Sequence, residues 1–157
     1  MSTTNPIAKR FREVIFDGTF VAFTNYKDQL SQVKLAEATQ KVGPLNTVAA
    51  LTYHINYYIA GVLNVFEGGG LEIRDKFSFD LPPLNSEEEW DKLKHALFSN
   101  SEKFAAHLDG FSEEKYKEGF VDEKYGTYRR NIDGMIEHCY YHLGQISIIR
   151  KMIAEGM

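Results

Sequence analysis

The chain has 157 residues, of which 43% are hydrophobic and 25% are charged, and its formal net charge is −4 at pH 7. This length and composition predict a single domain, residues 1–157, with a sizeable hydrophobic core. The acidic balance, without any block of like charges, argues against nucleic acid or an anionic membrane as the main partner.

The N-terminal region carries mixed charges and no long apolar run, which argues against a secretory leader. No stretch of about eighteen apolar residues occurs, so no membrane span is expected. We therefore predict a cytoplasmic protein. The single cysteine, Cys139, cannot form an internal disulfide and is expected to be a small core residue.

Four long helices are predicted in chain order. The first begins at Asn5-Pro6, because proline is tolerated in the first helical turn. It ends before Asp17-Gly18. Short helical pieces are expected between residues 28 and 42. The second long helix covers residues 46–66 and ends at Gly68-Gly69-Gly70, where glycine readily adopts the conformations that terminate helices.

The third and fourth helices have recognisable ends. Ser86-Glu87-Glu88-Glu89 matches a capping box, so the third helix is expected to run from there to about Leu108. The fourth is expected to run from about Thr127 to about Ala154. Arg150 and Lys151 lie in its final turns, where positive charge is favourable beside the helix dipole.

The connection from Glu67 to Asn85 predicts the topology. A helix of about twenty residues is about 30 Å long, and about eighteen extended residues can reach about 60 Å. The connection can therefore return along the whole bundle, so that the second and third helices run parallel. We predict an all-α four-helix bundle with a long crossover between helices 2 and 3, in which helices 2 and 4 are adjacent and antiparallel.

The crossover itself is expected to be a surface loop pinned by its aromatic residues. Its polar side chains could also rim a pocket. The residues concerned are Arg74, Asp75, Lys76, Phe77 and Phe79.

Three histidines are predicted to be metal ligands. His138 and His142 are spaced i, i+4, so their rings stack on one face of the fourth helix, which is largely apolar. His54 lies on the flank of the apolar face of the second helix. An inward imidazole needs a partner, because a buried unpaired polar group costs about 1–3 kcal/mol, and one cation would satisfy all three rings. His95 and His107 are interpreted as incidental.

Three histidine ligands would leave one coordination position open to substrate or water. Imidazole suits both zinc and nickel, so the sequence does not choose between these divalent ions. Polar residues on the same helix faces are candidates to orient the rings or contact the bound group: Tyr58, Asn131 and Gln145, with Thr47 as a further candidate. Gly61 is expected to leave room for a ligand. Ordinary core histidines without metal remain an alternative.

Two other metal chemistries do not fit the spacing. A di-iron carboxylate bundle needs a glutamate three residues before a histidine, but these positions hold Leu51, Met135 and Cys139. A zinc protease motif needs a glutamate directly after its first histidine, where this chain has Cys139.

Two segments carry a resemblance to a known family. They are Leu51-Thr52-Tyr53-His54-Ile55-Asn56-Tyr57-Tyr58 and His138-Cys139-Tyr140-Tyr141-His142-Leu143-Gly144-Gln145-Ile146. With them, the chain resembles the DinB/YfiT-like superfamily of metalloenzymes over nearly its whole length. The resemblance implies a four-helix bundle with a crossover between helices 2 and 3, a three-histidine site for zinc or nickel, and often a homodimer.

Members of that superfamily include S-transferases and isomerases that use bacillithiol or mycothiol, and metal-dependent hydrolases. The expected function is thus a mononuclear metal-dependent enzyme, a thiol S-transferase or a hydrolase, acting on a small molecule. Basic residues could bind the carboxylates of a low-molecular-weight thiol: Arg74, Lys76, Arg129 and Arg130. No catalytic side chain is identified. The alternative is a non-catalytic, stress-associated bundle in which the metal only ties two helices together.

Overall fold

The computed structural model describes residues 5–157, in which the regular secondary structure is helical. These residues form no β-strand, only one isolated bridge between Gly119 and Thr127. The predicted all-α class is therefore confirmed. The α-helices are α1 (Pro6–Arg12), α2 (Tyr26–Leu30), α3 (Leu35–Ala38), α4 (Val48–Phe66), α5 (Glu87–Gly110), α6 (Glu113–Lys117) and α7 (Tyr128–Ala154), joined by a π-helical turn η1 (Glu13–Asp17) and two 3₁₀ turns, η2 (Asp75–Phe77) and η3 (Glu123–Tyr125).

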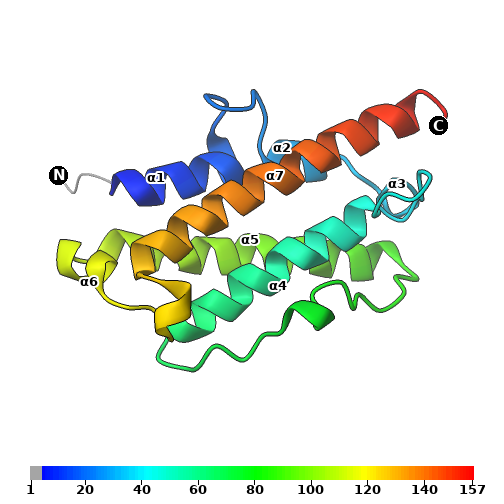
Figure 1. The fold of residues 1–157 in the computed structure, drawn as a ribbon. Helices are drawn as coiled ribbons and strands as arrows, with labels where there is room; N and C mark the ends of the chain where they lie inside the picture. The colour runs from blue at the N-terminus through cyan, green and yellow to red at the C-terminus, as the bar shows by residue number, and fades with distance from the viewer. Residues whose placement is uncertain (1–4) are drawn as a thin grey trace.

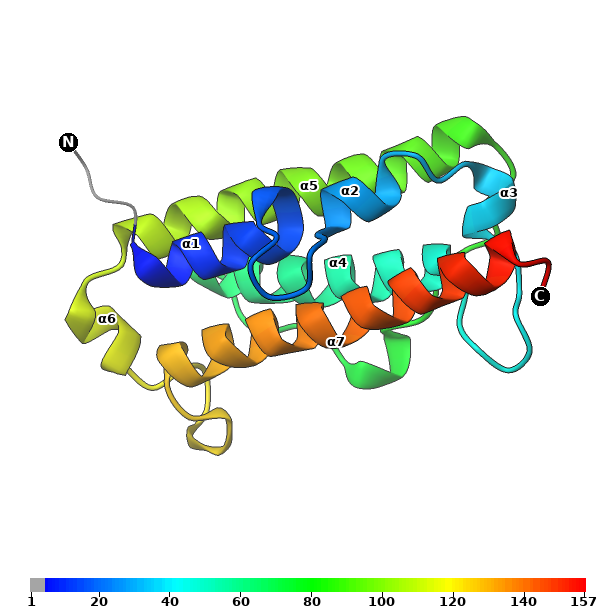
Figure 2. The same cartoon turned by 90° about the horizontal axis from the view of Figure 1, so that it is seen from above.

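The long helices pack lengthwise against one another. Figures 1 and 2 show α4 and α5 side by side and running in the same direction, whereas α7 runs the opposite way across α4. The green segment after α4 returns along the bundle to the start of α5. These are the helix directions that the length of the 67–85 connection predicts. None of the helices in residues 5–157 is long and apolar enough to cross a membrane.

Side-chain caps define the helix starts. Asn5, Ser86 and Thr127 each accept a hydrogen bond from a backbone N–H of the turn that follows, at 2.8, 3.1 and 3.1 Å for the shortest bond of each. The first helix differs from the prediction: after α1 it continues as the turn η1, in which the N–H of Gly18 donates to the carbonyl oxygen of Glu13 at 3.0 Å. Such π turns widen a helix locally.

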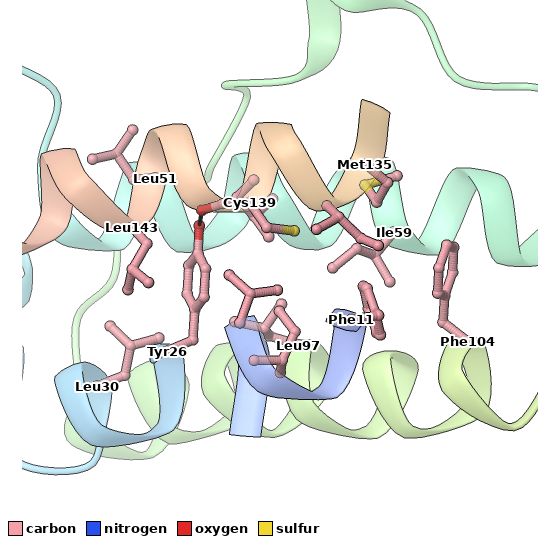
Figure 3. Packing of buried hydrophobic residues seen from close by; sticks show 14 of the residues in the cluster. Phe11, Tyr26, Leu30, Leu51, Ile59, Leu97, Phe104, Met135, Cys139 and Leu143 are labelled. Carbon is pink, nitrogen blue, oxygen red and sulfur yellow. Dashed lines mark hydrogen bonds between the residues drawn. The ribbon is translucent and has the colours of Figure 1, made fainter. Parts of the chain in front are cut away.

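The core lies between α4, α5 and α7, with α1 and α2 closing the remaining side (Figure 3). Cys139 is fully buried and has a free thiol, as expected of a core residue, and burial raises the pKa of that thiol. Beside it, the hydroxyl of Tyr26 donates to the carbonyl oxygen of Cys139 at 2.7 Å (Figure 3). This bond ties α2 to the middle of α7.

Gly61 does not leave room for a ligand, contrary to the expectation from the sequence. A Cβ atom at this position would lie 2.6 Å from two side-chain carbons of Ile73, on the crossover. The missing side chain instead allows the crossover to pack closely on α4.

Gly61→Ala is therefore expected to destabilise the protein by about 1–3 kcal/mol, because the branched side chain of Ile73 must move. Gly144→Ala is the matched control on α7, since its Cβ would meet nothing within 4 Å. That variant should be neutral or more stable by up to about 1 kcal/mol. Chemical denaturation of both variants checks the expectation, and equal stability of Gly61→Ala and wild type would contradict the close contact.

Candidate metal centre

The three predicted histidines meet between α4 and α7. Their candidate ligand atoms all lie within 4.8 Å of one another. The Nε2 atom of His138 is 3.2 Å from that of His54 and 2.8 Å from that of His142. His54 and His142 are buried, and His138 is half-buried. The antiparallel packing of α4 on α7 brings the two segments together, and the i, i+4 spacing aligns the pair on α7.

The outer nitrogens of two rings have partners of their own. Nδ1 of His54 lies 3.3 Å from the carbonyl oxygen of Ser78, and Nδ1 of His142 lies 2.6 Å from Oε1 of Gln145. Carbonyl oxygens only accept hydrogen bonds, so both contacts are hydrogen bonds in the tautomer that carries the proton on Nδ1. The Nε2 atoms of His54 and His142 therefore present lone pairs toward His138.

This arrangement fits a cation. A neutral His138 has one N–H, so its Nε2 atom either donates one proton or adds a third lone pair to the cluster. In both cases at least one of the three Nε2 atoms has a lone pair that accepts no hydrogen bond from the other two rings. One metal ion accepts all three lone pairs, and the outer contacts already fix the rings in the tautomer that a metal requires.

The electrostatic environment keeps the rings neutral. Burial, followed by the charges of His142 and His54, lowers the pKa of His138 to about 4. Burial is also the largest cause that lowers the pKa of His54 and of His142. Neutral imidazole is the form that binds metal, so at neutral pH the three rings are in the protonation state that binding requires.

The metal-free protein is expected to lose stability as the pH falls from about 6.5 toward 4. In the unfolded chain a histidine has a pKa near 6.5, whereas that of folded His138 is about 4. Between these values the unfolded state binds more protons. The free energy of unfolding then falls with decreasing pH, by at most about 1.4 kcal/mol per pH unit for one histidine.

Denaturation of metal-free protein at several pH values measures this dependence. His138→Gln should make it shallower, because glutamine does not titrate, while His54 and His142 keep part of the dependence. An equally steep dependence in that variant would contradict the lowered pKa of His138.

The polar candidates have different roles from one another. Gln145 contacts the ligand His142 directly, as expected. The ring of Tyr58 lies edge-on to those of His54 and His138, with centroids 5.0 and 5.2 Å away, and its hydroxyl donates to Asp75 at 2.7 Å. Tyr58 therefore lies beside the histidines.

Asn131 and Thr47 are not bonded to the histidines. The side-chain amide of Asn131 donates to the carbonyl oxygens of Tyr125 and Thr127, at 2.8 and 2.7 Å, and so holds the loop before α7. Thr47 caps α4 by accepting a hydrogen bond from the N–H of Ala50 at 3.0 Å. Neither residue therefore orients a histidine ring, because local backbone groups take up its polar atoms. Asn131 does line the cavity beside His138, so its expected contact with a bound group stays a prediction.

The crossover contributes more to the site than the sequence indicated. Phe79 stacks on the ring of His54 with a centroid distance of 4.0 Å and an interplanar angle of 10°. The carbonyl oxygen of Ser78 holds the same ring. Reasoning from the sequence missed Ser78, because a backbone carbonyl is available at every residue and gives no signal.

A cavity of about 450 Å³ opens beside the histidines. Of the three rings, only that of His138 lines it, together with Tyr58 and Asp75. His138 is thus the ring through which the cluster borders this cavity. The other lining residues are Val62, Leu71, Ile73, Phe120, Lys124, Tyr125, Arg130, Asn131, Gly134 and Met135.

The remaining sequence candidates lie elsewhere, except Arg130, which lines the cavity. Arg129 pairs with Asp133 at 2.9 Å. His95 is exposed on α5, and His107 packs near Phe66, so both are outside the cluster.

Gln145→Leu is expected to lower metal affinity about 10–100-fold, because the substitution removes the acceptor that fixes the ring of His142. Competition with a metal-indicator dye measures the change. Asn64→Leu on α4 is the control for loss of a side-chain amide, since the amide of Asn64 donates to the carbonyl oxygen of Gly70 and contacts none of the three histidines. Equal affinity of Gln145→Leu and wild type would show that the contact does not support the metal.

Comparisons of the chain with protein-family models, with curated proteins and with solved structures found no match. The residues of the site therefore carry the functional inference.

Proposed function

We propose that the protein is a mononuclear metal-dependent enzyme of the DinB/YfiT-like type, a thiol S-transferase or a hydrolase. His54, His138 and His142 hold its divalent ion, either zinc or nickel. One observation carries the proposal: three imidazole nitrogens converge beside a cavity that is lined by His138 and is large enough for a small molecule.

The helix arrangement supports the same proposal. The sequence resemblance implies a crossover between the second and third long helices, and α4 and α5 run parallel with a long connection between them. The crossover also supplies Ser78 and Phe79 against His54. A fold of this kind brings one ligand from α4 and two from α7 to the same point.

A bound divalent ion would lower the pKa of a coordinated thiol or water and so provide a nucleophile at neutral pH. Other residues of the chain would orient the ligands and contact a substrate. Ser78 and Gln145 orient the two buried rings, and apolar side chains form part of the cavity wall. Tyr58 and Asp75 form a hydrogen-bonded pair that lines the cavity with His138, where a substrate could hydrogen-bond to them.

The alternative is a non-catalytic role in which the ion only ties α4 to α7. A purely structural zinc site is normally closed by a fourth protein ligand. In the described part of the chain the converging group of ligand side chains has three members, all histidines. The three-ligand set favours the enzyme.

Cobalt substitution tests the proposal. Protein purified without a nickel column should contain about one divalent ion per chain, and Co²⁺ should replace it. Because Co²⁺ absorbs visible light, a thiol that enters the open position should add a sulfur-to-cobalt charge-transfer band. Absence of bound metal, or a cobalt spectrum that no thiol or pH change alters, would contradict an open catalytic site.

A further inference from the structure

The cavity beside the metal centre differs in charge along its length. His138, Tyr58 and Asp75 line one end of it, and the hydroxyl of Tyr58 donates to the carboxylate of Asp75. Lys124, from η3, and Arg130, from the first turns of α7, line it as well. Arg130 and His138 are eight residues apart on one helix, which corresponds to about 12 Å along its axis. The basic side chains and the metal ligand are therefore at separate ends.

The two basic side chains have no carboxylate partner within residues 5–157. Neither takes part in an ion pair there, whereas the neighbouring Arg129 is paired with Asp133. The ammonium of Lys124 lies 5.0 Å from the centre of the Tyr125 ring, on the same turn. The positive end of the α7 dipole adds to their field. This end of the cavity is thus suited to an anion.

The wall between the two ends is apolar and open. Val62, Ile73 and Met135 contribute aliphatic or thioether surface. Gly134 lies between the levels of Arg130 and His138 on α7, and a Cβ atom there would meet nothing within 4 Å. The wall therefore leaves space for a chain of apolar atoms to lie along the helix.

We infer that the cavity binds an elongated anionic molecule, whose carboxylate or phosphate is held by Lys124 and Arg130 while its other end reaches His138. In the metal-free protein Asp75 disfavours the reverse orientation, because its carboxylate would repel an anion beside His138. A bare inorganic anion would fill only one end of the cavity. This inference adds a substrate class to the proposed function. It rests on that function for the reaction at the end of the substrate beside His138.

Three probes with the same eight-carbon chain test the inference: octanoate, octyl phosphate and 1-octanol. Each is titrated into the zinc-loaded full-length protein, and binding is followed by ligand-observed NMR. At least one of the two anions should bind about tenfold or more tightly than the alcohol, because Lys124 and Arg130 can donate charge-assisted hydrogen bonds to it. Comparison of octanoate with octyl phosphate shows which anionic group Lys124 and Arg130 bind more tightly.

Lys124→Gln and Arg130→Gln should each reduce this preference severalfold, and together they should abolish it. Arg129→Gln makes the same charge change on the adjacent residue outside the cavity, so its preference should equal that of wild type. Equal binding of the anions and the alcohol by wild type, or a preference that survives the double substitution, would overturn the inference.

Repeating the titrations with metal-free protein tests the anion preference independently of the metal site. Since the basic end lies about 12 Å along α7 from His138, the anion preference should persist without zinc. A preference that appears only with zinc would mean that the anion binds the ion itself, and this would also overturn the assignment to Lys124 and Arg130. Failure to bind any metal would contradict the proposed function alone.

Discussion

His142→Ala is expected to remove nearly all bound metal, with at least a hundredfold loss of affinity. The ring of His142 is one of the three converging candidate ligands, and its Nε2 lies 2.8 Å from that of His138. Loss of a contact outside the ligands typically costs 10–100-fold in affinity, so loss of a ligand itself should cost more. Metal analysis after dialysis against a weak chelator measures the content per chain. His54→Ala and His138→Ala should give the same result.

His95→Ala and His107→Ala are the matched controls, because these histidines lie outside the cluster. They should retain the metal content of wild type. Circular dichroism should accompany each measurement, since His142 is buried and its removal leaves a small cavity. Equal metal content in wild type and a folded His142→Ala variant would rule out the three-histidine site.

The helices and the pairing of His138 with His142 could be predicted because both depend on local patterns, whereas His54 joins the pair through the packing of α4 on α7. Apolar periodicity and the Ser86 and Thr127 caps define the helix positions. The i, i+4 spacing of His138 and His142 depends only on helix geometry. The length of the 67–85 connection was enough to predict that α4 and α5 run parallel, since a short connection could not return along the bundle.

The contacts of the crossover could not be predicted in the same way. The carbonyl oxygen of Ser78 reaches His54 because of the path of the backbone, which no side-chain pattern encodes. Likewise, Ile73 fills the space beside Gly61, so the glycine serves packing where the sequence suggested ligand binding. Lys124 gave no signal either, because an exposed lysine in a turn is common. Tertiary packing alone brings it to the cavity that contains His138.

Metal-loaded wild-type protein is expected to accelerate conjugation of a low-molecular-weight thiol to an electrophile by tens of fold at pH 7, and His138→Ala should lose this acceleration. A free thiol with a pKa near 8.5 is only a few per cent ionised at pH 7. Coordination at the open side of the cluster would ionise most of the bound thiol. The rate should therefore rise with pH and reach its plateau below the pKa of the free thiol.

The acid side of this profile follows from the histidines. Protons compete with metal for imidazole, but the pKa of His138 is lowered to about 4 and those of His54 and His142 are also lowered. A lowered pKa means that fewer protons bind at a given pH, so metal and activity should be lost only below the ordinary histidine pKa of about 6.5. The assay compares wild type and His138→Ala over a panel of bacterial thiols and electrophiles, with matched metal supply. Equal rates for the two proteins with every pair would reject the transferase, and a metal-bound water that hydrolyses a substrate, or a non-catalytic ion, would then explain the site better.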